Sequence, residues 1–79
     1  METEELVEKI REILKKEISD KYYKKFFVYG FDSAEVNGTK LIWTCKDELS
    51  KQKVSNYYKP FILAACTSAG TEIKEIEVK

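Results

Sequence analysis

The dipeptide Asn37-Gly38 stands between two runs of strand-forming residues and constrains the fold more than any other feature of the sequence. Asn-Gly is the strongest short hairpin signal, because both residues accept the positive φ angles that a type I′ turn requires. The dipeptide therefore predicts two antiparallel strands, at residues 31–36 and 40–45. Alternation in the second strand predicts a core face and an opposite face, with Leu41, Trp43 and Cys45 on the first and Ile42 and Thr44 on the second.

Apolar residues at helical spacing lie at the start of the chain. They recur at steps of three and four with charged residues between them, which predicts a helix over about residues 4–17 with the stripe Leu6, Ile10, Ile13, Leu14 and Ile18. The next stretch, KYYKKFFVY, sorts its residues as a helix but not as a strand, because helical spacing gathers Tyr23, Phe26 and Phe27 on one side. We expect this second helix over about residues 20–28, ending near Gly30.

A third helical stretch begins after the hairpin, with Asp47 as its N-cap and Gly70 just beyond its end. Pro60 predicts either a kink or a boundary between two abutting helices, since proline cannot donate a hydrogen bond to the carbonyl of Asn56. Residues 71–78 are expected to form a last strand whose alternation slips once, as at a bulge. The apolar stripe of the third helix consists of Leu49, Val54, Tyr57, Tyr58, Phe61, Ile62, Ala65 and Cys66.

The order helix, helix, strand, strand, helix, strand predicts an α+β fold with helices on one face of a three-stranded sheet. The 79 residues contain no repeat or linker, so we expect one domain over residues 1–79. No apolar run has the roughly 18 residues of a membrane span, and the acidic start is unlike a signal peptide. We therefore expect a cytoplasmic protein with no membrane partner. Cys45 and Cys66 are expected to be reduced packing residues, with a disulfide between them as the alternative.

The residues that usually carry chemistry are scarce. There is no histidine, which removes the commonest general base and the commonest nitrogen ligand of metals. The three glycines form no phosphate-binding loop. A carboxylate pair such as Asp47 with Glu48 is better explained by a helix cap and a solvated surface than by acid–base catalysis. We expect no enzyme activity, no cofactor, no metal and no small-molecule substrate.

The charge is balanced overall but uneven along the chain. Fourteen basic and fourteen acidic residues give no net field that would attract nucleic acid. Lysines nevertheless cluster beside an aromatic residue in the second helix, and a second basic cluster follows in the third, at Lys51, Lys53 and Lys59. An ordinary solvated face is the simpler interpretation of both. Weak binding of single-stranded DNA is the alternative for the first cluster, through Lys21, Tyr22, Lys24 and Lys25.

Several of these features together resemble the amino-terminal domain of the bacterial chromosome-replication initiator DnaA, which has a KH-like αα-ββ-α-β fold. Ile18-Ser19 is similar to the Leu-Ser that ends the first helix of that family, and Tyr23 and Phe26 stand at the places of its Phe and Trp. Tyr57 falls at the place of the family's tyrosine in the third helix, and Gly70 at its last turn. The resemblance extends over nearly the whole chain.

This resemblance implies a non-enzymatic domain for self-association, helicase loading and regulator binding in replication initiation, with weak single-stranded DNA binding in some members. The chain departs from the family at Val7, where a tryptophan often stands, and in TCKDEL, where the family tends to have A-P-N-x-F. The resemblance thus implies a protein-binding surface rather than a set of matched side chains. The partner-binding residues that we expect are Val7, Tyr22, Lys25, Phe26, Lys46 and Glu48. A small KH-like module that binds single-stranded nucleic acid is the alternative.

Overall fold

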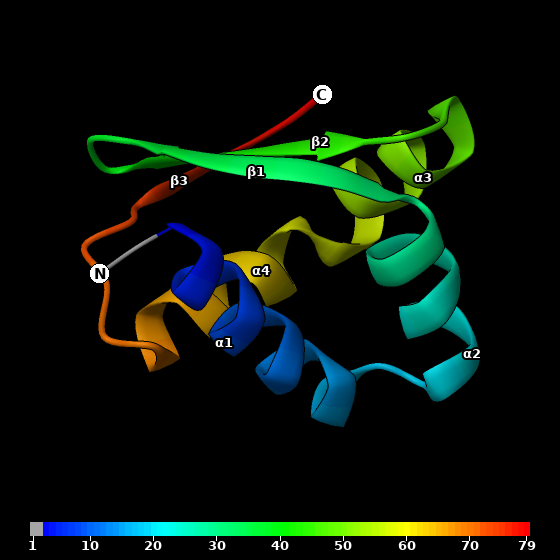
Figure 1. The fold of residues 1–79 in the computed structure, drawn as a ribbon, viewed down its shortest axis with the longest axis horizontal. Coiled ribbons are helices and arrows are strands. Elements are labelled where there is room, and N and C mark those ends of the chain that lie inside the picture. Colours follow the sequence, from blue (N-terminus) through cyan, green and yellow to red (C-terminus); the bar gives the residue numbers. More distant parts are fainter. Residues whose placement is uncertain (1–2) are drawn as a thin grey trace.

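The computed structural model describes residues 3–79, and its helices lie on one side of a three-stranded sheet (Figure 1). Two short π-helical segments, labelled η, continue α-helices without a break. In chain order the elements are α1 (Thr3–Glu17), α2 (Asp20–Tyr23), η1 (Lys24–Tyr29), β1 (Phe31–Asn37), β2 (Lys40–Cys45), α3 (Glu48–Lys53), η2 (Val54–Tyr58), α4 (Lys59–Ser68) and β3 (Glu75–Val78). The α+β fold and the predicted order of elements are confirmed.

Strand β2 lies at the centre of the sheet. It pairs with β1 in antiparallel and with β3 in parallel orientation, so β1 and β3 are the two edges. In the register of the parallel pair, Leu41 is opposite Ile76 and Trp43 is opposite Val78. Leu41 and Trp43 face the helices and are fully buried, while the alternate residues of β2 are on the opposite face of the sheet. The predicted core face of β2 is confirmed.

The turn between β1 and β2 differs from the type I′ turn predicted for Asn37-Gly38. Asn37 is still paired with Lys40, so the two loop residues are Gly38 and Thr39. Gly38 has a φ of 65°, whereas no non-glycine residue in the range 3–79 has a positive φ. A positive φ at the first loop residue alone is the requirement of a type II′ turn, which favours glycine at that position.

The core is formed where α1, η1 and α4 meet the sheet. Helix α1 has the predicted bounds to within one residue, and its stripe is buried except for Ile13, which is half-buried, with Ile10 and Leu14 at 0% exposure. Phe27 of η1 packs edge-on against Trp43, with 6.0 Å between the ring centroids. Figure 1 shows α1 and α4 beneath the sheet and α2 and α3 toward its right-hand end. The predicted packing of the helices on one face is confirmed.

The third helical stretch is interrupted near Pro60. The carbonyl of Asn56 has no α-helical donor at Pro60, and the chain takes a π-helical form over η2 immediately before α4 begins. This interruption changes the phase of the stripe expected to face the core. The prediction was right for Val54, Ile62, Ala65 and Cys66 but wrong for Leu49, Tyr57 and Phe61, which are exposed.

The last strand, the cysteines and the membrane-span expectation remain to be compared with the structure. The last strand begins at Glu75 rather than at residue 71, and the irregular register lies at Asp32 in β1 rather than in β3. Cys45 and Cys66 are free thiols, as predicted, and burial raises the pKa of each to about 11. None of the helices within the described residues is long and apolar enough to cross a membrane.

Candidate functional site

Four aromatic rings form a continuous row across the second and third helical stretches, which are α2 with η1 and α3 with η2 and α4. We call it the aromatic row. Tyr22 stacks on Phe26 with 6.3 Å between centroids and 6° between planes. Phe26 contacts Tyr58 at 5.8 Å, and Tyr58 contacts Phe61 at 6.0 Å. The two ends of the row are open to solvent, since Tyr22 is 47% exposed and Phe61 is 40% exposed. The row therefore presents aromatic surface that the fold itself does not cover.

Local helical geometry places these rings. Tyr22 and Phe26 are four residues apart and share one side of α2 and η1, whereas Tyr58, the last residue of η2, and Phe61 of α4 are three residues apart. Phe26 and Tyr58 lie in the π-helical segments η1 and η2. Such segments are rare and occur frequently at functional sites. The two halves meet because the second and third helical stretches pack side by side against the same core.

Tyr58 connects the aromatic row to the core. Its ring packs edge-on against Phe27, which is fully buried, with 5.4 Å between centroids. Burial raises the pKa of the Tyr58 hydroxyl, and the neighbouring Tyr22 hydroxyl raises it further. At neutral pH this hydroxyl therefore stays protonated and can donate a hydrogen bond to a bound partner.

Lysine side chains lie along the aromatic row. The Nζ atom of Lys25 is 5.6 Å from the centroid of Phe26. The Nζ atom of Lys53 is 5.0 Å from the centroid of Tyr57, an exposed ring that is not part of the row. Lys21 is one helical turn before Lys25 and is also exposed. Lys24 differs, because its Nζ forms a 3.2 Å ion pair with Asp20. The surface around the row is therefore basic as well as aromatic.

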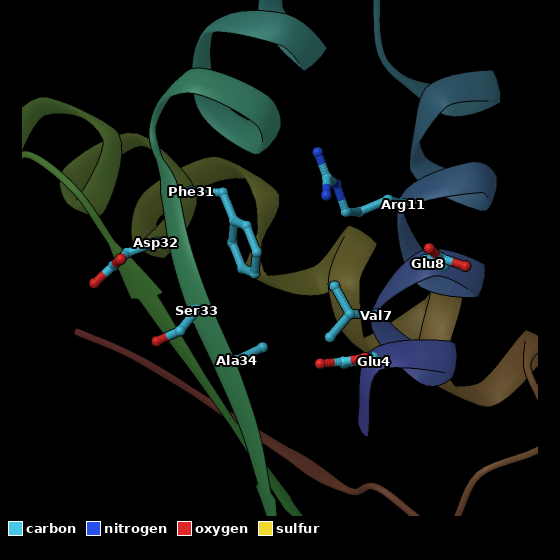
Figure 2. Close-up of a pocket in the computed structure, with 8 residues that line it drawn as sticks. All are labelled: Glu4, Val7, Glu8, Arg11, Phe31, Asp32, Ser33 and Ala34. Carbon is cyan, nitrogen blue, oxygen red and sulfur yellow. The ribbon is translucent and has the colours of Figure 1, made fainter. Parts of the chain in front are cut away.

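The six residues expected to bind partners fall into three groups in the structure. Tyr22, Lys25 and Phe26 lie together, although Phe26 is only 3% exposed and so offers almost no accessible surface. Lys46 and Glu48 are exposed at the start of α3, beside the end of η1. Val7 is only 8% exposed and faces a groove between α1 and β1 (Figure 2), so it is not part of the same surface.

A backbone contact joins the start of α3 to the end of η1. The N–H of Lys46 donates to the carbonyl of Gly30 at 2.8 Å, and Ser50 packs directly against Gly30. The Gly30 N–H in turn donates to the carbonyl of Lys25 at 3.0 Å, which is the five-residue step of a π-helix. These contacts link the start of α3 to the segment that carries Phe26 of the aromatic row.

Helical spacing alone places Tyr57, Tyr58 and Phe61 on the core stripe, so it predicts neither the exposure of Tyr57 and Phe61 nor the place of Tyr58 in the aromatic row. The signal that could have separated them was Pro60, since an interruption of the helix shifts the phase of the residues on either side. Tyr57 is 60% exposed, and Tyr58 is half-buried.

Comparisons with family models, curated proteins and solved structures found no match for this chain.

Proposed function

We propose that this chain is a non-enzymatic protein-interaction domain that binds its partners through the aromatic row and the lysines beside it. The observation that carries the proposal is the continuous row of ring contacts from Tyr22 through Phe26 and Tyr58 to Phe61, with both ends exposed. It lies over the second helix and meets the third, where the resemblance to the DnaA amino-terminal domain also implies a partner surface. Self-association, helicase loading and regulator binding in the bacterial cytoplasm are the corresponding roles.

The chemistry of this surface supports binding. Tyrosine and phenylalanine bury a large area at a small cost in side-chain entropy, and aromatic residues are enriched among those that dominate binding energy. Lys25 beside the Phe26 ring, with Lys21 one helical turn before it, favours a partner with acidic residues around an apolar centre. The thiols are poor nucleophiles at neutral pH, because burial raises the pKa of both Cys45 and Cys66.

The test compares aromatic truncations inside and outside the row. Tyr22→Ala and Phe61→Ala remove its two exposed ends, and Tyr29→Ala removes an exposed tyrosine of η1 that is not part of the row. Binding of each variant to the replicative helicase from the same genome is measured by isothermal titration calorimetry. Self-association is measured by sedimentation velocity, and circular dichroism checks that each variant folds.

We expect Tyr22→Ala and Phe61→Ala each to weaken partner binding about tenfold or more, and Tyr29→Ala to leave it within about twofold. Equal affinity across all three variants would contradict the proposed surface. Glu48→Ala provides a further variant at the start of α3, outside the rings but on the surface implied by the resemblance.

Weak binding of single-stranded DNA is the second candidate. The exposed Tyr22 ring has Lys21 and Lys25 nearby on the same helical segment, which is the combination that stacks a base and neutralises a phosphate. Lys24 contributes less, since it is paired with Asp20. This candidate predicts an affinity for a fluorescent oligonucleotide that falls steeply with salt and is reduced by Lys25→Glu. A titration without binding at low salt would eliminate it.

A further inference from the structure

A groove of about 400 Å³ runs between the first half of α1 and strand β1, and its lining includes none of the four rings of the aromatic row (Figure 2). One wall is formed by residues on one side of α1: Glu4, Val7, Glu8 and Arg11. The other wall is formed by residues 31–34, four consecutive residues of β1. Successive residues of a strand point to opposite faces of the sheet, so a groove lined by four in a row opens onto the backbone edge of the strand.

Strand β1 is an edge of the sheet and has backbone groups to offer at this groove. It pairs with β2 on one side, and no strand of the described residues pairs with its other side. The register shift leaves Asp32 without an opposite residue in β2. A sheet edge with unpaired N–H and C=O groups is a template for the addition of another strand.

The side chains of the groove define the chemistry of its occupant. Val7, Phe31 and Ala34 supply an apolar floor, with Val7 buried and the other two half-buried. Glu4 and Glu8 supply two exposed carboxylates from α1, against one guanidinium, whereas the exposed carboxylate of Asp32 points to the side of β1 away from α1 (Figure 2). That guanidinium, of Arg11, lies over the Phe31 ring with its Cζ atom 5.4 Å from the centroid. The groove is therefore apolar at its base and carries two carboxylates and one guanidinium on its helical wall, which favours basic side chains in its occupant.

We propose that this groove binds an extended, basic segment of a partner protein, which adds to β1 as a fourth strand. Alternate residues of such a segment face α1 and are lysine or arginine, whose aliphatic stems lie against Val7, Phe31 and Ala34 and whose charged ends reach Glu4 and Glu8. The residues between them face the opposite side of the sheet, as Asp32 and Ser33 do (Figure 2). The site is separate from the aromatic row, so the domain has one surface for acidic partners and another for basic ones.

The test uses a defined peptide and a matched pair of charge reversals. The probe is a fluorescein-labelled, C-terminally amidated peptide of about eight residues that alternates valine with lysine. Its control replaces each lysine with glutamate. Glu8→Lys reverses a charge in the groove, and Glu12→Lys makes the same change one turn later on α1, outside the residues that line the groove.

By fluorescence anisotropy at low salt, we expect the lysine peptide to bind the wild-type chain and the glutamate peptide not to bind. Glu8→Lys should weaken binding about fivefold or more, while Glu12→Lys should change it by less than about twofold. Absence of lysine-peptide binding up to about 1 mM would overturn the proposal. Equal effects of the two reversals would also overturn it, as would self-association of the chain that Glu8→Lys abolishes, which would assign the groove to a second copy.

Two N-methylated peptides distinguish strand addition from simple charge attraction. Each carries methyl groups on the amides of one edge of the peptide, so each loses the hydrogen-bond donors of that edge and keeps its charge. Strand addition predicts that only the peptide methylated on the edge facing β1 loses binding, and that amide resonances of residues 31–34 shift in ¹H–¹⁵N spectra. Equal binding by both peptides would overturn strand addition.

Discussion

Gly30 lies where the end of η1 meets the first turn of α3, and its substitution by alanine tests how tightly these elements are packed. A Cβ atom at this position would lie 2.8 Å from the carbonyl oxygen of Lys25 and 2.9 Å from the Cβ of Ser50, and closer still to the Oγ of Ser50. Carbon atoms do not approach so closely without displacing their neighbours. Ser50 is only 2% exposed, so its side chain has no solvent to move into.

The expected effect of Gly30→Ala combines two opposing contributions to the free energy of unfolding. The φ of Gly30 is −86°, which alanine also adopts, so the substitution gains about 0.4–1 kcal/mol by restricting the unfolded chain. Overpacking costs about 1–3 kcal/mol, and the upper part of that range applies because one displaced atom belongs to the backbone. We therefore expect a net destabilisation of about 1–2.5 kcal/mol, or a fall of roughly 5–15 °C in Tm for a domain of this size.

Thermal and urea denaturation followed by circular dichroism measure this change, and a second background separates its causes. Ser50→Gly removes both side-chain atoms that obstruct the new methyl group but leaves the Lys25 carbonyl in place. In that background we expect Gly30→Ala to cost at least about 0.5 kcal/mol less than in the wild type. An unchanged or raised Tm for Gly30→Ala in the wild type would refute the reasoning, and an identical cost in both backgrounds would refute the part assigned to Ser50.

Three further predictions concern single interactions. Asp47→Ala should lower the free energy of unfolding by about 1 kcal/mol in urea titrations, because an Asp47 Oδ1 atom caps α3 by accepting a 2.7 Å hydrogen bond from the Ser50 N–H. Lys40→Ala should raise the pKa of Glu77 toward its ordinary value in an NMR titration. The hydrogen bond and charge of Lys40 hold the pKa of Glu77 below its ordinary value. The stability that the Lys40–Glu77 interaction contributes is therefore lost as the pH falls through the pKa of Glu77 in the folded chain. Cys66 should react with a thiol reagent at pH 8 far more slowly in the folded chain than in urea, because its side chain is buried. Burial also raises the pKa of its thiol to about 11. The stability that burial of the neutral thiol contributes is therefore complete below about pH 9 and is lost as the pH rises through 11. Equal labelling rates in the two states would contradict the burial of this thiol.

The sequence alone determined the order and type of the elements because those depend on local patterns. The stripe that includes Ile10 and Leu14 predicts α1, since helical periodicity is visible within a few turns. The alternation around Trp43 predicts the buried face of β2 in the same way. The exposed position of Tyr22 also follows from the sequence, because helical spacing separates it from the side of Tyr23 and Phe27.

Only the tertiary structure decided which aromatic residues are exposed in the third helical stretch. Tyr57 and Phe61 match a core stripe if the helix is continuous, but the π-helical turn before Pro60 changes the phase. The meeting of Phe26 with Tyr58 depends on how two helical stretches separated in sequence pack on one core. The tight contact at Gly30 is of the same kind, since Ser50 comes from another element.

The groove beside β1 was likewise decided by the tertiary structure. The hairpin at Gly38 determines that β1 pairs with β2, but the sequence does not determine which side of the hairpin the last strand joins. Because β3 pairs with β2, strand β1 stays an edge and Glu8 of α1 stands beside its free backbone. Local propensities determine the elements of this protein, whereas long-range pairing and packing determine the two surfaces on which its proposed functions depend.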